Sequence, residues 1–264
     1  MILKSKPIFS PRPWGDRLLN ELYKVDTQDP VGEVWLLSDF QGMRTELCEG
    51  ERCIYPVDLT EPLFNKDLPR FPLLVKYICA NDWLSVQVHP DDELARFLEG
   101  EPWGKNECWY FLQNGRIAAG ITRPEKPLED LRNDDLRILT PERGDLVCLQ
   151  AGTVHSLGPG SKVIEVQQAS DMTYRIYDWG RGRELHLDKA KVATKAAASA
   201  IVIEEMKKFD WKYFSMELTR KVEGSGIVIT LSETLELYVL LDARKEFPED
   251  VLFVRPGNFW GESF

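Results

Sequence analysis

Short apolar runs rich in β-branched and aromatic residues recur between Val31 and Trp179. They are bounded by Gly, Pro, Asn and Asp and have the sequences GEVWLLS, FPLLVKYICA, WLSVQVHP, ECWYFLQ, DLVCLQ and KVIEVQQ. Runs of this length and composition are typical of β-strands. Turn signals lie at Asn114–Gly115, Arg143–Asp145 and Gly158–Gly160. We therefore expect a mostly β fold, an antiparallel jelly-roll sandwich or barrel, and not a parallel α/β fold, which needs alternating helices.

Helical patterns interrupt the strand pattern at three places. In DDELARFLEG, Asp91 or Asp92 can cap a helix and Gly100 can end it. A second helix is predicted in PLEDLRNDDL, and both segments read as surface insertions. After His186, the run DKAKVATKAAASAIVIEEMKKF is rich in Ala, Lys and Glu and predicts one helix or two helical pieces. Within it, AIVIEEM fits the start of a strand equally well.

Strand-like runs return from about Trp211 to Phe264, with the sequences KYFSMELTRKV, GIVITLS, LELYVLL and VLFVRPG. They suffice for an additional β-sheet but are few for a second barrel. A chain of 264 residues can form one large domain or two small ones. We expect a main β domain at residues 1–190 and, at residues 191–264, a helical connection with a short additional β region.

Composition narrows the range of partners. The chain is 43% hydrophobic and 29% charged, which is typical of an ordinary globular protein. Its net charge of −10 argues against a nucleic-acid or anionic-membrane partner, although a few local Lys or Arg would suffice for a phosphorylated substrate. Neither a signal-peptide core nor an apolar run near the ~20 residues of a membrane span is visible. We expect a soluble cytoplasmic protein, and the sequence leaves a homo-oligomer open.

The five cysteines form an odd, scattered set with no CxxC pair. Such a set disfavours a disulfide framework and a thiolate zinc site. We expect reduced thiols in the core or at the surface.

Polar residues at alternating positions give the first indication of a site. In SVQVHPDD, Ser85, Gln87 and His89 alternate with Val86 and Val88. In a strand, the three polar side chains would share one face and the valines the other. That polar face could bind a ligand, or it could simply face solvent.

Two further segments carry candidate ligands. In GKNECWYFLQ, Lys105 and Glu107 share one face of a predicted strand, although an exposed strand edge would look the same. In LQAGTVHSLGPG, His155 lies between two tight turns, a suitable place at the mouth of a barrel, but also one for a surface histidine. His186, before the helical run, has the setting of a packing or capping residue.

Taken together, Gln87, His89, Glu107 and His155 offer two imidazoles, one carboxylate and one amide oxygen. This mixed nitrogen and oxygen set suits Zn²⁺, Mn²⁺, Fe²⁺ or Co²⁺, and the ligand types do not choose among these ions. Three strong ligands and one weak ligand leave positions open for a substrate, as in catalytic metal sites.

Several motifs resemble those of one family, the class I mannose-6-phosphate isomerases in their short bacterial form. The motifs are WLSVQVHPDD, GKNECWYFL, AGTVHSLGPG and EVQQASDMTYRIYDWGR, with weaker likeness in PRPWG, GEVWLLS and PLLVKYI. The resemblance extends from about Pro7 to Ala190. Beyond Phe209 it is limited to general strand character, and the ending GNFWGESF looks abbreviated relative to the family's second cupin domain.

The resemblance implies a cupin fold that holds one divalent metal ion, with zinc as the first expectation. By motif it makes the same four residues, Gln87, His89, Glu107 and His155, the metal ligands. One departure is Cys108, where the family usually has Met. We expect this side chain to face the core without functional change.

The resemblance also implies that Lys105 and Arg175 line the substrate pocket and act in catalysis. Ser85 is a further substrate-binding candidate, as is the stretch Gln168–Asp171. The structural alternative for Arg175 is an ion pair with Asp171 or Asp178.

The implied reaction interconverts mannose 6-phosphate and fructose 6-phosphate through an enediol. The sequence leaves the general base open among histidine, lysine and metal-bound water. One alternative is a non-catalytic cupin that binds a sugar or sugar phosphate as a regulatory module, which the abbreviated C-terminal region supports. The presence of Lys105, Arg175 and all four ligands argues against it. The other alternative, an oxygen-using metal-dependent cupin, lacks motif support.

Overall fold

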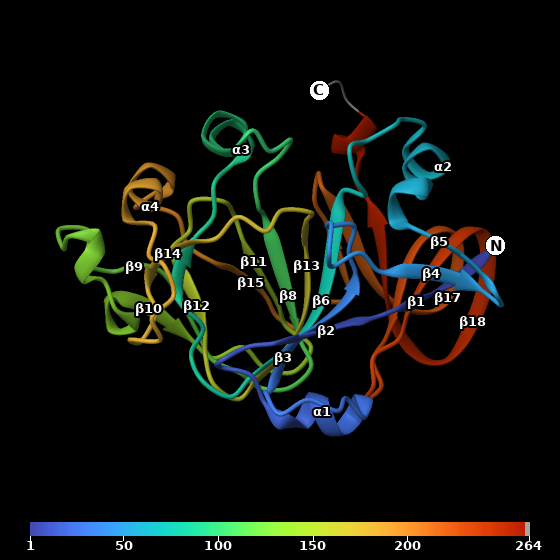
Figure 1. Ribbon diagram of the computed structural model, residues 1–264, viewed down its shortest axis with the longest axis horizontal. Coiled ribbons are helices and arrows are strands. Elements are labelled where there is room, and N and C mark those ends of the chain that lie inside the picture. Colours follow the sequence, from blue (N-terminus) through green and yellow to red (C-terminus); the bar gives the residue numbers. More distant parts are fainter. Residues whose placement is uncertain (262–264) are drawn as a thin grey trace.

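The structure is a computed structural model that describes residues 1–261, and it is built mainly from three antiparallel β-sheets (Figure 1). The prediction of a mostly β, antiparallel fold is therefore confirmed. The last three residues of GNFWGESF lie outside the described residues.

The two sheets of the main β fold have seven and five strands. The seven-stranded sheet has the order β15-β11-β8-β13-β6-β3-β2, with β2 (Ile8–Pro11), β3 (Val31–Leu37), β6 (Leu73–Ala80), β8 (Glu107–Phe111), β11 (Leu146–Leu149), β13 (Ser161–Gln168) and β15 (Ile201–Ile203). The five-stranded sheet has the order β10-β9-β12-β7-β14, with β7 (Val86–Val88), β9 (Ile117–Ile121), β10 (Leu136–Leu139), β12 (His155–Leu157) and β14 (Tyr174–Tyr177).

Apolar residues from these two sheets pack into one cluster, as in a jelly-roll sandwich. Ile78 and Trp109 come from the seven-stranded sheet, and Ile117 and Leu157 come from the five-stranded sheet. All eight residues of β6 are buried, as are nearly all of those in β13. Strands covered on both faces lose the alternation of polar and apolar residues, which explains continuous runs such as FPLLVKYICA.

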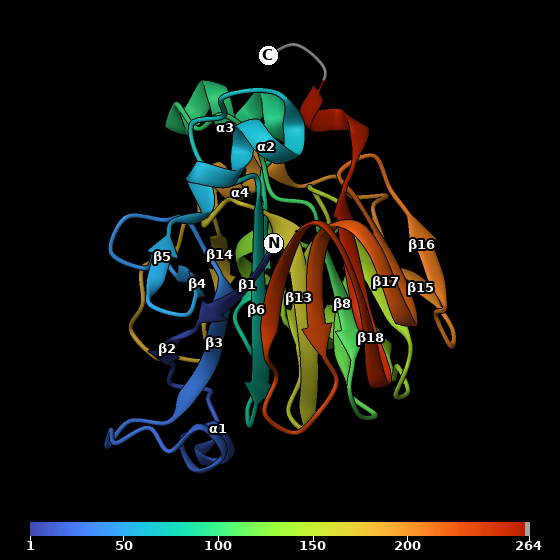
Figure 2. The ribbon, with the colours of Figure 1, turned by 90° about the vertical axis from the view of Figure 1, so that its right-hand side faces the viewer.

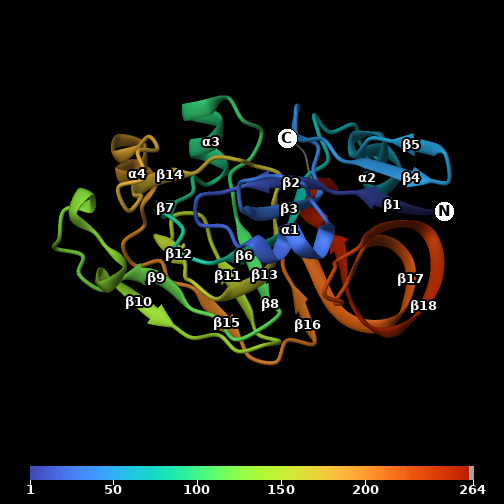
Figure 3. The same cartoon turned by 60° about the horizontal axis from the view of Figure 1, so that its bottom comes forward.

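The third sheet joins the two ends of the chain. Its six strands have the order β16-β17-β18-β1-β4-β5, with β1 (Ile2–Lys6), β4 (Glu46–Glu49), β5 (Arg52–Ile54), β16 (Lys208–Asp210), β17 (Phe214–Thr230) and β18 (Leu237–Pro256). The four strand-like runs predicted after Trp211 lie within only two strands, because β17 and β18 are long and bent. Figure 3 shows the pair curling into a ring.

Two glycines, and the pairing of β17 with both ends of β18, explain this curl. Gly224 and Gly226 in β17 have positive φ angles of 96° and 156°, which other residues rarely adopt. Beyond them, Ile227 pairs with both Val239 and Val254, so the two ends of β18 lie on opposite sides of β17.

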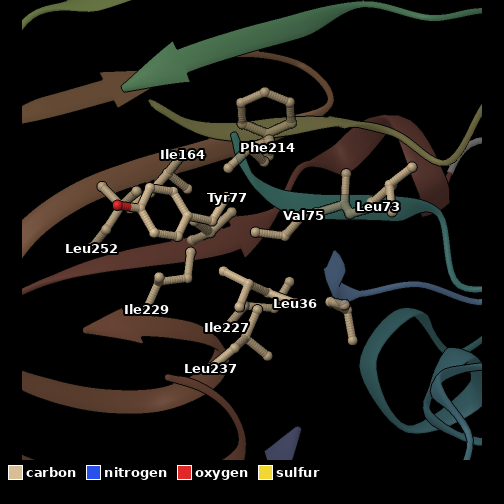
Figure 4. Packing of buried hydrophobic residues seen from close by; sticks show 14 of the residues in the cluster. Leu36, Leu73, Val75, Tyr77, Ile164, Phe214, Ile227, Ile229, Leu237 and Leu252 are labelled. Atoms are coloured by element: carbon tan, nitrogen blue, oxygen red, sulfur yellow. The ribbon is translucent and has the colours of Figure 1, made fainter. Parts of the chain in front are cut away.

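The curled pair packs on the outer face of the seven-stranded sheet, in front of β6 and β13 in Figure 2. Figure 4 shows Val75 and Ile164 of that sheet close to Phe214 and Ile229 of β17. This shared cluster is the largest in the described chain, and it is distinct from the cluster inside the sandwich.

Helices are short and lie at the periphery. They are α1 (Arg17–Tyr23), α2 (Thr60–Phe64), α3 (Asp92–Glu99) and α4 (Leu187–Ala193), with 3₁₀ turns η1 (Pro56–Leu59), η2 (Leu128–Asp130), η3 (Asn133–Asp135) and η4 (Asn258–Gly261). Helix α3 confirms the predicted helix, with Asp91 as its N-cap and Gly100 ending it in the left-handed conformation.

The other two helical predictions were less accurate. The segment PLEDLRNDDL forms only η2 and η3, because side chains in this Asp- and Asn-rich segment bond to the backbone locally, as Asp135 does to the amide of Arg132. The run after His186 forms the single helix α4 and then the strand β15, so the alternative of a strand in AIVIEEM is confirmed.

Cysteine pairing differs in part from the expectation. Cys48 and Cys53 face each other across the β4–β5 hairpin and form a disulfide, so the prediction of reduced thiols was wrong for this pair. Residues five apart were overlooked as partners because only a hairpin turn brings them together. Cys79, Cys108 and Cys148 are buried free thiols, and Cys108 lies in the core as expected.

Among residues 1–261, no helix has both the length and the apolar character required to cross a membrane.

The shared core leads to a prediction about the division at residues 190 and 191. We expect Phe214→Ala to lower the free energy of unfolding by about 3–5 kcal/mol, because a fully buried aromatic ring is removed. Circular dichroism and tryptophan fluorescence should give one coincident transition for wild type and variant. Phe97→Ala, at a position that is 83% exposed, is the control and should change little. Two separate transitions, of which only one shifts, would show that the two regions unfold independently.

Candidate metal centre and substrate pocket

The candidate ligands come from both sheets of the sandwich. Cross-strand pairing places Gln87 of β7 beside His155 of β12 on one side and beside Arg175 of β14 on the other. His89 follows the end of β7 at an alternating position, so it joins this row. Glu107 begins β8 in the other sheet, so the site forms only where the two sheets meet.

Three of the predicted ligands form a compact buried cluster. Each of His89, Glu107 and His155 is at most 2% exposed, and their donor atoms all lie within 4.8 Å of one another. The Glu107 Oε1 atom is 3.1 Å from His155 Nε2 and 3.6 Å from His89 Nε2.

Backbone carbonyls determine that Nδ1 carries a hydrogen in both imidazoles. His89 Nδ1 lies 2.8 Å from the Met172 carbonyl, and His155 Nδ1 lies 2.9 Å from the Thr153 carbonyl. Because a carbonyl can only accept a hydrogen bond, each Nδ1 carries a hydrogen, and Nε2 is then the nitrogen with a lone pair in the neutral ring. Both Nε2 atoms lie close to Glu107 Oε1.

Electrostatics keep the cluster in a form that can bind metal. Burial, with Lys105 nearby, lowers the pKa of His89 to about 3, so this histidine is neutral near pH 7. Burial alone would raise the pKa of Glu107, but the neighbouring Lys105 outweighs it and holds that pKa well below its usual range. The cluster thus brings a carboxylate close to the neutral imidazole of His89 and to His155 Nε2.

This donor set fits a divalent cation. Two imidazole nitrogens and a carboxylate oxygen approach one another, and neither His89 Nε2 nor Glu107 Oε1 has a hydrogen-bond partner. Such facing acceptors repel unless a cation lies between them. Ligands at ~2.0–2.1 Å from a tetrahedral centre lie roughly 3.3 Å apart, close to the separations observed.

The fourth predicted ligand adjoins this cluster with its amide turned the other way. Gln87 Nε2 lies 3.3 Å from His155 Nε2, while its Oε1 accepts a hydrogen bond from Ser85 Oγ at 2.8 Å. Ligation requires the oxygen to face the cluster. A half-turn of the amide would provide this, and Nε2 would then donate to Ser85 Oγ.

A polar cavity of about 290 Å³ opens beside the cluster, close to the ~300–1,000 Å³ typical of small-molecule sites. Ser85, Gln87, Lys105 and Arg175, four of the residues identified from the sequence, line it. Among its walls are five cationic side chains, Arg12, Lys76, Lys105, Arg175 and Arg183, and three carboxylates, Glu33, Glu165 and Asp171.

Lys105 links the cavity to the cluster. Its Nζ atom is 3.0 Å from Glu107 Oε2, and the residue is 4% exposed. The ammonium therefore touches a candidate metal ligand while also lining the space open to a substrate.

Arg175 is available to a ligand. Asp178, one partner considered for it, is held by Arg183 at 2.5 and 2.8 Å instead. Within residues 1–261, the Arg175 side chain forms no hydrogen bond or ion pair, and its Nε atom is buried. Burial and the neighbouring Arg183 lower the pKa of Arg175. His186 accepts a hydrogen bond from the Arg175 backbone amide and lies outside the cluster, in agreement with its predicted packing role.

A network of ion pairs in the wall of the same cavity was not predicted from the sequence. Lys76 Nζ is 3.2 Å from Glu165 Oε2, and Arg12 is 2.9 Å from Glu33 Oε2. Burial would raise the pKa of Glu33, but Lys76 and Arg12 together lower it to about 2. The available signal was a lysine inside the apolar run FPLLVKYICA, where a charge requires a partner.

A jelly-roll sandwich with two histidines and a glutamate buried between its sheets has the architecture of a metal-binding cupin. Residues 14–116 match the family model described as phosphomannose isomerase type I, catalytic domain. The chain is also 36% identical over 198 residues to the mannose-6-phosphate isomerase of Streptococcus mutans. The chain is therefore similar to type I phosphomannose isomerases, over residues 14–116 by the family model and over 67% of its length by the S. mutans relative.

The alignment with the S. mutans protein covers 67% of this chain but only 62% of that relative. Solved structures match over nearly the whole fold. The Bacillus subtilis mannose 6-phosphate isomerase superposes with a TM-score of 0.76 at 23% identity, covering 96% of this chain and 98% of that one. A zinc-bound mannose 6-phosphate isomerase superposes with a TM-score of 0.71 at 13% identity, covering 97% and 99%. At these identities the superpositions establish the fold alone.

The cluster predicts a specific loss of metal binding. We expect His155→Ala to abolish stoichiometric binding of Zn²⁺ or Co²⁺, because one of two imidazole ligands is removed. Metal content after dialysis, measured by mass spectrometry, tests this, and circular dichroism checks the fold. His186→Ala is the matched control, since it removes a histidine outside the cluster, and it should retain the metal. Full metal content in His155→Ala would disprove the assignment.

The Glu33 network predicts an acid-dependent contribution to stability. The pKa of Glu33 is lowered in the folded state, so its contribution is complete above the unfolded value of about 4.5 and disappears as the pH falls towards 2. We expect Glu33→Gln to reduce the free energy of unfolding near pH 7, with a difference from wild type that shrinks from pH 4.5 downwards. Urea unfolding at several pH values measures this difference. A constant difference would contradict the depressed pKa.

Proposed function

We propose that the protein interconverts mannose 6-phosphate and fructose 6-phosphate, using one divalent metal ion, with zinc as the first choice. Gln87, His89, Glu107 and His155 would hold the ion. The observation that carries this proposal is the buried His89–Glu107–His155 cluster beside a cavity rich in cationic side chains. The similarity to type I phosphomannose isomerases supports the same reaction.

The reaction moves a proton between C2 and C1 of the sugar through an enediol, whose oxygens carry developing negative charge. When bound, the metal supplies Lewis-acid stabilisation of that charge. The chain must also orient the sugar, exclude water, and place a base that takes the proton from one carbon and returns it to the other.

We assign catalytic roles to Lys105 and Arg175. The Lys105 ammonium borders both the cavity and Glu107, so it can donate hydrogen bonds to sugar oxygens next to the reacting carbons. Arg175 presents an unpaired guanidinium whose two parallel donors match a substrate oxyanion. Ser85 lines the same wall and would bind substrate through its hydroxyl.

The charge of the cavity supports a phosphorylated substrate. Its five cationic side chains outnumber its three carboxylates, although the whole chain carries a net charge of −10. A local excess of positive charge in an acidic protein favours a small anion over a nucleic acid. We propose a hexose phosphate as the partner and, since such phosphates are intracellular metabolites, a cytoplasmic location. A non-catalytic sugar-phosphate-binding cupin would share this cavity but would not require a proton-transfer site.

A coupled assay of mannose 6-phosphate conversion tests the proposal directly. Activity should disappear after chelation and return on addition of Zn²⁺, Mn²⁺ or Co²⁺. Absence of turnover in folded, metal-loaded protein that still binds mannose 6-phosphate would favour the non-catalytic cupin.

Arg175 predicts a loss of turnover without a loss of stability. We expect Arg175→Lys to lower kcat/KM by about 10²-fold, because lysine keeps the charge but loses the paired donors. Arg181→Lys is the matched control, since Arg181 bonds to Asp82 and the Trp83 carbonyl and does not line the cavity. Equal catalytic efficiency for Arg175→Lys and wild type would remove Arg175 from the site.

A further inference from the structure

Asn106 lies between Lys105 and Glu107 but does not line the substrate cavity. We propose that it is a positioning residue, which holds the chain segments carrying the metal ligands in mutual register. This inference rests on the proposed metal centre, and it assigns Asn106 no contact with the substrate.

The Asn106 side chain is buried and its hydrogen-bonding groups are engaged by three other segments. Its Oδ1 atom accepts from the backbone amide of Ala151 at 2.9 Å. Its Nδ2 atom donates to Gln168 Oε1 at 2.6 Å and to the Tyr213 hydroxyl at 3.1 Å. The residue is 6% exposed, so water does not substitute freely for these partners.

The bond to Ala151 fixes the turn that orients both histidines. The neighbouring Gly152 donates its amide to the His89 carbonyl at 2.9 Å. In the same turn, the Thr153 carbonyl holds His155 Nδ1. A single side-chain oxygen thereby links the Glu107 segment to the segments of the other two ligands.

The bond to Gln168 holds a second group of segments next to the proposed metal site. Gln168 Nε2 donates to Asp92 Oδ1 at 2.9 Å, and Asp92 is the first residue of α3, three residues after His89. Gln168 also ends β13, and the chain continues to Met172, whose carbonyl orients His89 Nδ1. Two independent connections from Asn106 therefore converge on His89.

The contact with Tyr213 extends this network to the C-terminal region. Its hydroxyl also lies 3.4 Å from Asp92 Oδ2, so it meets the same carboxylate as Gln168. The curled β17–β18 unit, which begins at the next residue, is thus tied to the outer side of the metal centre.

Removal of the Asn106 side chain would leave the Ala151 amide and the Gln168 amide oxygen with fewer partners, and the ligand segments could shift. Outer groups that orient metal ligands typically change metal affinity or activity by ~10–100-fold when mutated. A residue important only for folding would lower stability without this effect on the metal.

The test compares Asn106→Ala with Asn20→Ala in the full-length protein. Asn20 is also buried, and its side chain ties α1 to the backbone of one other segment, at Asp29 and Val31, away from the proposed metal centre. Zn²⁺ affinity is measured by competition with a chromophoric chelator, Co²⁺ coordination by its visible absorption spectrum, and stability by thermal unfolding of the metal-free proteins.

We expect Asn106→Ala to weaken Zn²⁺ binding by roughly 10–100-fold and to alter the Co²⁺ spectrum. Asn20→Ala should lower the unfolding temperature but retain wild-type affinity and spectrum. Wild-type affinity and spectrum in Asn106→Ala, or equal losses in both variants, would overturn the positioning role.

Failure of the proposed function can be distinguished from failure of the positioning role. Metal-loaded wild type that lacks isomerase activity would refute that function while leaving the affinity comparison valid. Wild type that binds no metal would refute the metal centre and the role of Asn106 together.

Discussion

The site depends on one electrostatic constraint, which is that His89, His155 and Glu107 direct acceptor atoms towards one buried point. Because the carbonyls of Met172 and Thr153 take the Nδ1 hydrogens, a neutral imidazole at either position has no second hydrogen to offer Glu107. Such an arrangement is costly in a protein interior unless a cation completes it. The surrounding structure, with strands from two sheets and turns tied together behind them, resists relaxation of this cluster.

The C-terminal region supports the site in two ways. It covers the outer face of the seven-stranded sheet, so the strands that carry Glu107 and Glu165 are supported from behind. It also reaches the segments around the proposed metal site, through the hydrogen bond between Tyr213 and Asn106. A close-packed interior transmits small displacements, because it has few voids to absorb them. Substitutions in the curled hairpin could therefore affect the geometry of the site without touching it.

The sequence predicted the architecture well, and it named the three residues that the structure gathers into one cluster, His89, Glu107 and His155. Strands β3, β6 and β8 are short, mainly apolar runs, and polar residues at alternating positions indicated which face of β7 could bind. The long bent strands β17 and β18 were divided wrongly into separate runs, since bending at Gly224 depends on tertiary packing. The opposite wall of the pocket was missed because Glu33, Lys76 and Glu165 lie far apart in sequence. Only strand pairing, with Lys76 opposite Glu165, brings them together.

The placement of the ligands on two sheets has a consequence for the amount of protein in a cell. An unfolded or half-assembled chain cannot present the complete ligand set, so a metal ion would bind only the closed sandwich and would stabilise it by mass action. At a free concentration 100 times the dissociation constant, such binding adds ~2.7 kcal/mol to native-state stability. Limited metal supply would then expose more of this protein to proteolysis, so that its abundance as well as its chemistry would follow the availability of the ion.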